Sequence, residues 1–354
     1  MNWILIAMLS IGILKFGQSL IAPLLVAVFI WYLLNAVAAY YKKILPESYR
    51  NGMAANIASI IASVGTFAGF VLLFSKNVRP VVAQFQQSLP LIQERITSLL
   101  THLAQQLDIT LDFTWLPDMQ RLAMSIGSSV ASLATSIGII SIYVLFMFIE
   151  QGTFKNKMKN LFASEQKYEM WNRIISKIHA AIKKYLFVKT AISLATGLAS
   201  YALMAALGLE MAMFWAFLIF ILNYIPTFGS IVAVTLPVAY AFASMSVGLA
   251  AWITAGLIAM QILFSNIIEP KLMGKTLNLS TLAILVNLVF WGMLWGAVGM
   301  FFSVPLLVGA FIITSHLKST RRIAVLLSAD GRIPEIKEDE PIKKKSNKLK
   351  NKKG

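Results

Sequence analysis

Four polar side chains stand in apolar sequence between residues 210 and 280, where they could bind a solute or an ion. Gln261 and Asn266 carry uncharged donors and acceptors that suit a polyhydroxylated substrate, and Asn223 lies three residues before a proline. Glu269 follows Asn266 by three residues and is the carboxylate closest to the interior of this region. Ionisable groups inside membrane segments commonly serve transport. Asn223, Gln261, Asn266 and Glu269 are therefore candidates for a substrate or ion site.

Each candidate also has a purely structural interpretation. An interfacial Glu269 that pairs with Lys271 or Lys275 needs no role in transport. The amides could cap exposed backbone or form interhelical hydrogen bonds, which are worth about 0.6–2 kcal/mol. Proline and glycine in the same region are expected to shape turns that expose carbonyl and amide groups. These geometry residues are Pro226, Gly229, Pro270 and Gly274.

The composition places these residues in a membrane protein. Of 354 residues, 58% are apolar and 13% charged, and the mean hydropathy is +0.73. Runs of about 20 apolar residues, enough to span a bilayer, recur along the chain. We therefore predict an all-α polytopic integral membrane protein with about eight transmembrane segments, including broken or re-entrant helical hairpins in the C-terminal half.

The net charge of +16 is concentrated in two blocks beside apolar spans. From Lys155 to Lys189 there are nine Lys or Arg and two Glu. From Lys318 onward there are twelve Lys or Arg and five acidic residues. Positive charge beside spans is typical of cytoplasmic loops, so we expect contact with the lipid bilayer and no nucleic-acid binding. Both termini are then cytoplasmic.

Hydropathy and charge divide the chain into six parts. The segment 75–123 carries balanced charge and helical apolar spacing, which indicates an external amphipathic helix. The other five parts are N-terminal transmembrane helices (1–74), a transmembrane helix (124–149), a basic amphipathic cytoplasmic helix (150–186), a C-terminal transmembrane core with two hairpins (187–317) and a basic cytoplasmic tail without stable structure (318–354).

Two segments of the core are expected to fold back on themselves. Residues 211–224 would form about 21 Å of helix, which is shorter than a bilayer core of about 30 Å, and Pro226 and Gly229 follow. Residues 231–245 are similarly short, whereas 282–314 are too long for one crossing. A hairpin that crosses the membrane twice and one that re-enters without crossing both leave the chain on the side where it began. The topology therefore allows either form. Transporters use such broken helices to build substrate sites.

The motifs of this region resemble those of a known family. NYIPTFGSIVAVTLP, which begins at Asn223, is similar to an Ile-Pro-x-x-Gly motif, and QILFSNIIEPKLMGKTLNLS, which begins at Gln261, to a Gln…Asn…Pro-x-x-x-Gly motif. Both motifs belong to the autoinducer-2 exporter family of bacterial permeases, and the similarity covers nearly the whole chain. One departure is Ser280-Thr281, where family members commonly have His-Pro. Detailed residue roles are therefore not transferred to this bend.

The resemblance implies a secondary transporter in the bacterial inner membrane that exports a small polar organic molecule such as autoinducer-2. It equally implies a monovalent cation/proton antiporter as the alternative, and a homo-oligomer, in particular a ring of five. The residues alone predict a transporter with broken helices, and a nontransporting membrane scaffold is the rival of another class.

An enzyme is not expected, because the chain has no GxSxG, HExxH or Walker A motif and no paired catalytic carboxylates. We predict no cofactor. The chain contains no cysteine, and its three histidines, His102, His179 and His316, are far apart, so no metal site is predicted either.

Overall fold

The computed structural model describes residues 12–44, 57–66, 136–162, 164–273 and 278–333, together with residue 9 and scattered positions from 68 to 105. Regular structure in these ranges is helical, apart from one antiparallel bridge between Leu279 and Ser328. Four helices are long and apolar enough to cross a membrane. The prediction of an all-α polytopic membrane protein is confirmed. Most of the predicted external segment, Gly274 and residues 334–354 lie outside the described residues.

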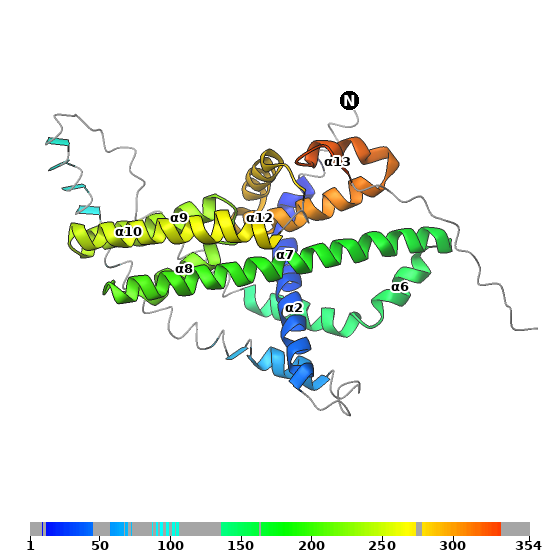
Figure 1. Ribbon diagram of the computed structural model, residues 1–354. Coiled ribbons are helices and arrows are strands. Elements are labelled where there is room, and N and C mark those ends of the chain that lie inside the picture. The colour runs from blue at the N-terminus through cyan, green and yellow to red at the C-terminus, as the bar shows by residue number, and fades with distance from the viewer. Residues whose placement is uncertain are drawn as a thin grey trace, which may run out of the picture.

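Two of the four long helices hold the first half of the core. Helix α2 (Gln18–Ile44) contains Pro23 in its second turn. The short helix α6 (Phe154–Leu161) precedes α7 (Glu165–Ala206), which at 42 residues is about 63 Å long. The sequence predicted a cytoplasmic amphipathic helix followed by a span, and the structure joins the two into this single helix (Figure 1).

The first predicted hairpin consists of α8 (Ala212–Leu222) and α9 (Phe228–Ser244), which pack against each other. Their connection contains Pro226, and Thr227 has a positive φ of 60°. Gly229 allows the close approach of the two arms, because a β-carbon there would collide with the carbonyl oxygen of Leu222. The hairpin tip is therefore built by the Pro and Gly positions that the sequence singled out.

The next span, Val247–Met273, is continuous but changes its winding. Helix α10 (Val247–Gln261) passes into the π-helical segment η2 (Ile262–Ile268) and then into the short α11 (Glu269–Met273). Pro270 explains this change, because its ring conflicts with a carbonyl four residues earlier in an α-helix. The amide of Glu269 instead reaches the carbonyl of Phe264, five residues back. Pro270 thus reshapes the helix without ending it.

Helix α12 (Thr281–His316) is the second hairpin. Trp295 and Gly296 have non-helical backbone angles, and Gly296 has a positive φ of 60°. The side chain of Asn287 donates to the carbonyl of Ser303 at 2.6 Å, although a straight helix would separate these residues by about 24 Å. The chain therefore folds back at Gly296, within the stretch that the sequence showed to be too long for one crossing.

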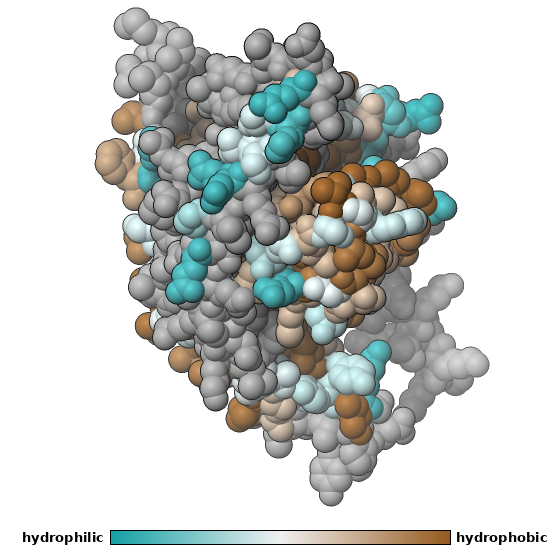
Figure 2. All heavy atoms as spheres, turned by 90° about the vertical axis from the view of Figure 1, so that its left-hand side faces the viewer, coloured by the Kyte–Doolittle hydropathy of each residue, from teal (hydrophilic) through white to brown (hydrophobic). Residues whose placement is uncertain are grey.

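Within the described ranges, three clusters of apolar side chains are buried. One joins the end of α7 to α8, α9 and α10, and a second joins the middle of α7 to α11, α12 and α13 (Arg321–Leu327). The third joins α2 to the helix Ser136–Glu150. Helices α7 and α10 run side by side (Figure 1), and α2 contacts α7 where the Tyr32 hydroxyl lies 2.8 Å from His179 Nδ1. Apolar side chains also face outward on α8–α10, including Met213, Ile231 and Trp252, as expected for lipid contact. Brown apolar side chains are visible at the surface in Figure 2.

Candidate functional site

A polar stripe runs along α7 between the first two apolar clusters. Lys189, Ser193, Thr196 and Ser200 are spaced by four, three and four residues, which places them on one face of the helix. All four are buried, with relative exposures of 4%, 0%, 1% and 1%. Buried polar groups need partners, so this stripe locates the elements that must supply them.

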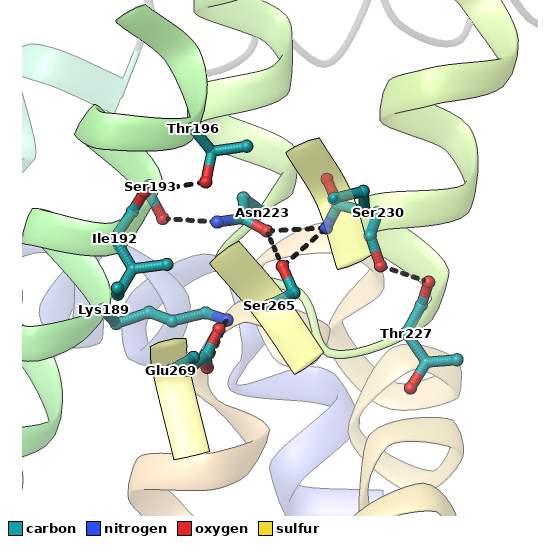
Figure 3. A network of polar contacts seen from close by, with 10 residues as sticks. Lys189, Ile192, Ser193, Thr196, Asn223, Thr227, Ser230, Ser265 and Glu269 are labelled. Atoms are coloured by element: carbon teal, nitrogen blue, oxygen red, sulfur yellow. Dashed lines mark hydrogen bonds and ion pairs between the residues drawn. The ribbon is translucent and has the colours of Figure 1, made fainter. Parts of the chain in front are cut away.

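The tip of the first hairpin supplies one partner. Asn223, at the end of α8, is 2% exposed and donates from Nδ2 to the Ser193 hydroxyl at 3.2 Å. Its Oδ1 accepts from Gln261 Nε2 and from the Ser265 hydroxyl, each at 3.3 Å, and Gln261 also donates to Ser265 at 2.7 Å (Figure 3). We call Ser193, Asn223, Gln261 and Ser265 the amide network. The amide network joins α7, the hairpin tip and the span Val247–Met273. We call this span the motif span, because it carries the motif that begins at Gln261.

The π-helical winding decides which residues of the motif span face this network. Gln261, Ser265 and Glu269 are each four residues apart and lie on one side of this span, where Gln261 and Ser265 bind Asn223 and Glu269 binds Lys189 of α7. Asn266 is exposed and lies outside the amide network. The structure thus brings together three of the four predicted site residues, Asn223, Gln261 and Glu269, and adds Ser265.

Glu269 forms a buried ion pair with α7. Lys189 Nζ lies 2.7 and 2.8 Å from the two carboxylate oxygens, and the side chains are 6% and 17% exposed (Figure 3). The structural interpretation of Glu269 expected Lys271 or Lys275 as the partner. Lys271 is exposed, and Lys275 lies outside the described residues. Glu269 is paired, but with a different helix, so the pair ties the motif span to α7.

Aromatic side chains hold the hairpin tip from its other side. Tyr224, next to Asn223, is 3% exposed and donates to the Thr190 hydroxyl at 2.8 Å. Its ring stacks on Phe301 of α12 with centroids 4.7 Å apart and meets Phe29 of α2 edge-on at 5.7 Å. Both hairpins and α2 therefore converge at the site.

The donors and acceptors of this arrangement match the chemistry of a neutral polar molecule. Amides and hydroxyls both donate and accept hydrogen bonds, and the adjacent ion pair has no net charge. Within the described ranges, no group of three His, Asp or Glu side chains is placed where it could hold a metal ion. Pro226, Gly229 and Pro270 lie around the site and shape its backbone, as described above.

Sequence reasoning did not single out Lys189, Thr190, Ser193 or Ser265. Lys189 was counted with the cytoplasmic basic block, although it follows three apolar residues at the start of a predicted span. The signal that could have found the stripe is the helical spacing of polar residues inside that span, because lipid-facing helices disfavour them.

Comparison with known proteins gives a consistent result. The family model described as AI-2E family transporter matches residues 4–319. The chain is 29% identical over 325 residues to the AI-2 transport protein TqsA of Escherichia coli K12, which covers 89% of this chain and 91% of that protein. It is also 29% identical to a putative transport protein of Haemophilus influenzae, over 88% and 91% of the two chains, and 26% identical to the putative permease PerM of Escherichia coli K12, over 86% and 89%.

Proposed function

Because the chain belongs to the AI-2E transporter family, we propose that it is a secondary transporter that moves one small polar organic solute across the bacterial inner membrane. Autoinducer-2 is the first solute to test, since one relative is named as its transport protein. At 29% identity a different solute of similar chemistry is equally compatible with the family. The direction proposed is export, which follows the resemblance of the motifs.

The observation that carries this proposal is the amide network at the tip of a broken hairpin. Asn223 is almost fully buried and bridges α7 to the motif span through three hydrogen bonds of 3.2–3.3 Å. Interhelical hydrogen bonds in membrane proteins average only about 0.6 kcal/mol. The hydroxyl and carbonyl groups of a solute can therefore replace them at little cost.

The test is flux of labelled autoinducer-2 in proteoliposomes, with and without a proton or Na+ gradient. Ser265→Ala should lower the flux about tenfold, because the hydroxyl that contacts Asn223 is lost. Ser244→Ala is the matched control, since the Ser244 hydroxyl binds only the Tyr240 carbonyl of its own helix, at 2.8 Å. Equal flux in the two variants would remove the amide network from the binding site.

A second candidate function is monovalent cation/proton antiport, and the Lys189–Glu269 ion pair favours it. A carboxylate in this position can bind a free cation in place of its ammonium partner. Na+-driven proton movement in proteoliposomes tests this function. Antiport that persists in Glu269→Gln would show that Glu269 does not carry the cation.

The nontransporting scaffold makes the opposite prediction for the same site. If the protein only held partners, replacing Asn223 and Gln261 together by Leu should leave its cellular phenotype intact. A transporter should lose that phenotype. The proposed homo-oligomer, a ring of five by resemblance, is tested by native mass spectrometry of the purified protein. The proposed cytoplasmic position of both termini is tested by labelling single cysteines introduced at each end of this cysteine-free chain.

A further inference from the structure

The segment after α13 is fastened to the loop that joins the motif span to α12. The Ser280 amide donates to the Leu327 carbonyl at 2.8 Å, and the Ala329 amide donates to the Asn278 carbonyl at 3.1 Å. These two bonds flank the antiparallel bridge between Leu279 and Ser328. We call residues 278–280 and 327–332 together the C-terminal clasp.

A side chain reinforces the C-terminal clasp at a strained position. Asn278 has a φ of 35°, a conformation that Asn tolerates better than most residues. Its Nδ2 donates to Asp330 Oδ1 and to the Arg332 carbonyl, both at 2.9 Å. The Arg332 amide also donates to Asp330 Oδ1, at 3.0 Å. The hydrogen bonds from Asn278 and then from the Arg332 amide hold the pKa of Asp330 below its ordinary value, so the carboxylate is charged at neutral pH.

The C-terminal clasp closes over the apolar cluster next to the ion pair. Leu279 is 8% exposed and packs in one cluster with Tyr185 and Val188 of α7 and with Ala324 of α13, which is 0% exposed. Tyr185 and Val188 lie directly before Lys189 on α7. A molecule that reached the ion pair through this cluster would therefore displace Leu279 or α13.

We propose that the C-terminal clasp is a gate on the transport path, which must separate for a solute to reach Lys189, Glu269 and the amide network. The inference rests on the proposed transport function. It assigns to residues 321–332 the control of access from the side of the C-terminus. Closed, the gate holds Leu279 in the apolar cluster that contains Tyr185 and Val188. Open, it frees the loop that carries Leu279 and leads from the motif span to α12.

A reversible crosslink tests whether the gate must open. Leu279 and Ser328 form a pair without mutual hydrogen bonds, in which the two Cα atoms lie about 4.5 Å apart, within the range that a disulfide spans. Because the chain contains no cysteine, Leu279→Cys with Ser328→Cys introduces only this pair. Oxidation should lower autoinducer-2 flux at least tenfold, and a reductant should restore it. The two single-cysteine variants, which should not respond to oxidation, are the controls.

A second measurement is independent of flux. Ser193→Cys places a thiol in the amide network, and its reaction with a membrane-impermeant maleimide added on the side of the C-terminus reports access. Ala329→Pro removes the amide that binds Asn278, and the preceding Ser328 has a ψ of 154°, which suits a residue before proline. We expect at least fivefold faster labelling with Ala329→Pro than with Ala329→Ser, which keeps the amide.

The outcomes separate the gate from the transport function. Crosslinked protein that retains the flux of reduced protein, or labelling that is equal in the two Ala329 variants, would overturn the gate. If no variant moves any tested solute while labelling still depends on residue 329, the gate is supported and the proposed function fails.

Discussion

The ion pair between Lys189 and Glu269 gives the sharpest test of how the site works. Lys189→Met removes the ammonium and keeps a side chain of similar length, which leaves the Glu269 carboxylate with 17% exposure and without its partner. Removing one member of a buried pair costs about 3–5 kcal/mol. Because Glu269 retains some exposure to solvent, we expect Lys189→Met to lower the free energy of unfolding by about 3 kcal/mol, the low end of this range.

The expected loss can be read as a melting temperature in detergent. For a large chain each kcal/mol shifts Tm by about 2 °C, so Lys189→Met should melt about 6 °C below the wild type. The double variant Lys189→Met with Glu269→Gln leaves no net charge behind, and removal of both members of a buried pair is often neutral. Its Tm should lie within about 2 °C of the wild type. If Lys189→Met had the Tm of the wild type, or if the double variant had the Tm of Lys189→Met, the claim that the two charges form a pair shielded from water would be refuted.

The same double variant separates the two candidate functions. A transporter of an uncharged solute needs a site without net charge, so the double variant should retain autoinducer-2 flux while both single variants lose at least tenfold. A cation/proton antiporter needs the carboxylate itself, so the double variant should lose Na+-driven proton movement. Flux is measured in the same proteoliposomes for all four proteins, with reconstituted protein amount as the control.

Three further predictions follow from the geometry. Gly229→Ala should lower Tm by several degrees, because its new methyl group meets the backbone of α8, whereas Gly248→Ala, with no atom within 4 Å of its added carbon, should leave Tm unchanged or raise it slightly. Asn266→Ala should keep at least half of the wild-type flux while Ser265→Ala does not, and the reverse order would mean that the π-helical register is wrong in the active protein. The lowered pKa of Asp330 contributes stability to the C-terminal clasp that is present above its ordinary pKa of about 3.9 and lost as pH falls through the lowered value. Hydrogen exchange of the clasp amides, corrected for intrinsic rates, should therefore accelerate only at strongly acidic pH.

Much of the architecture could be predicted because breaks are local. Pro226 and Gly229 end one helix and begin another, and Gly296 supplies a positive φ at the bend of α12. In lipid, such breaks in a long apolar run require protein or water partners for the freed backbone groups. Local composition was therefore enough to place both hairpins.

The candidate site could be predicted only in part, because its contacts join distant segments. Asn223 and Glu269 stood out as polar residues in apolar sequence, but their partners Ser193 and Lys189 lie 30 and 80 residues away in the chain. The sequence predicted Asn266 as a site residue, whereas the structure has Ser265 there, and this difference has another cause. An α-helical register of the motif span would place both Ser265 and Asn266 on the face of Glu269, and the π-helical winding before Pro270 keeps Ser265 there but turns Asn266 away.

The energies of these contacts assign different roles to the two parts of the site. Each bond of the amide network contributes on the order of 0.6 kcal/mol, whereas breaking the ion pair from one side costs about 3 kcal/mol or more. A solute can therefore displace the first set of bonds by offering equivalent hydrogen bonds, but it cannot separate the ion pair unless it brings a charge of its own. We therefore expect an uncharged solute to move α8 relative to the motif span, at Asn223, while Lys189 keeps that span attached to α7. A cation would act in the opposite way, releasing the motif span from α7.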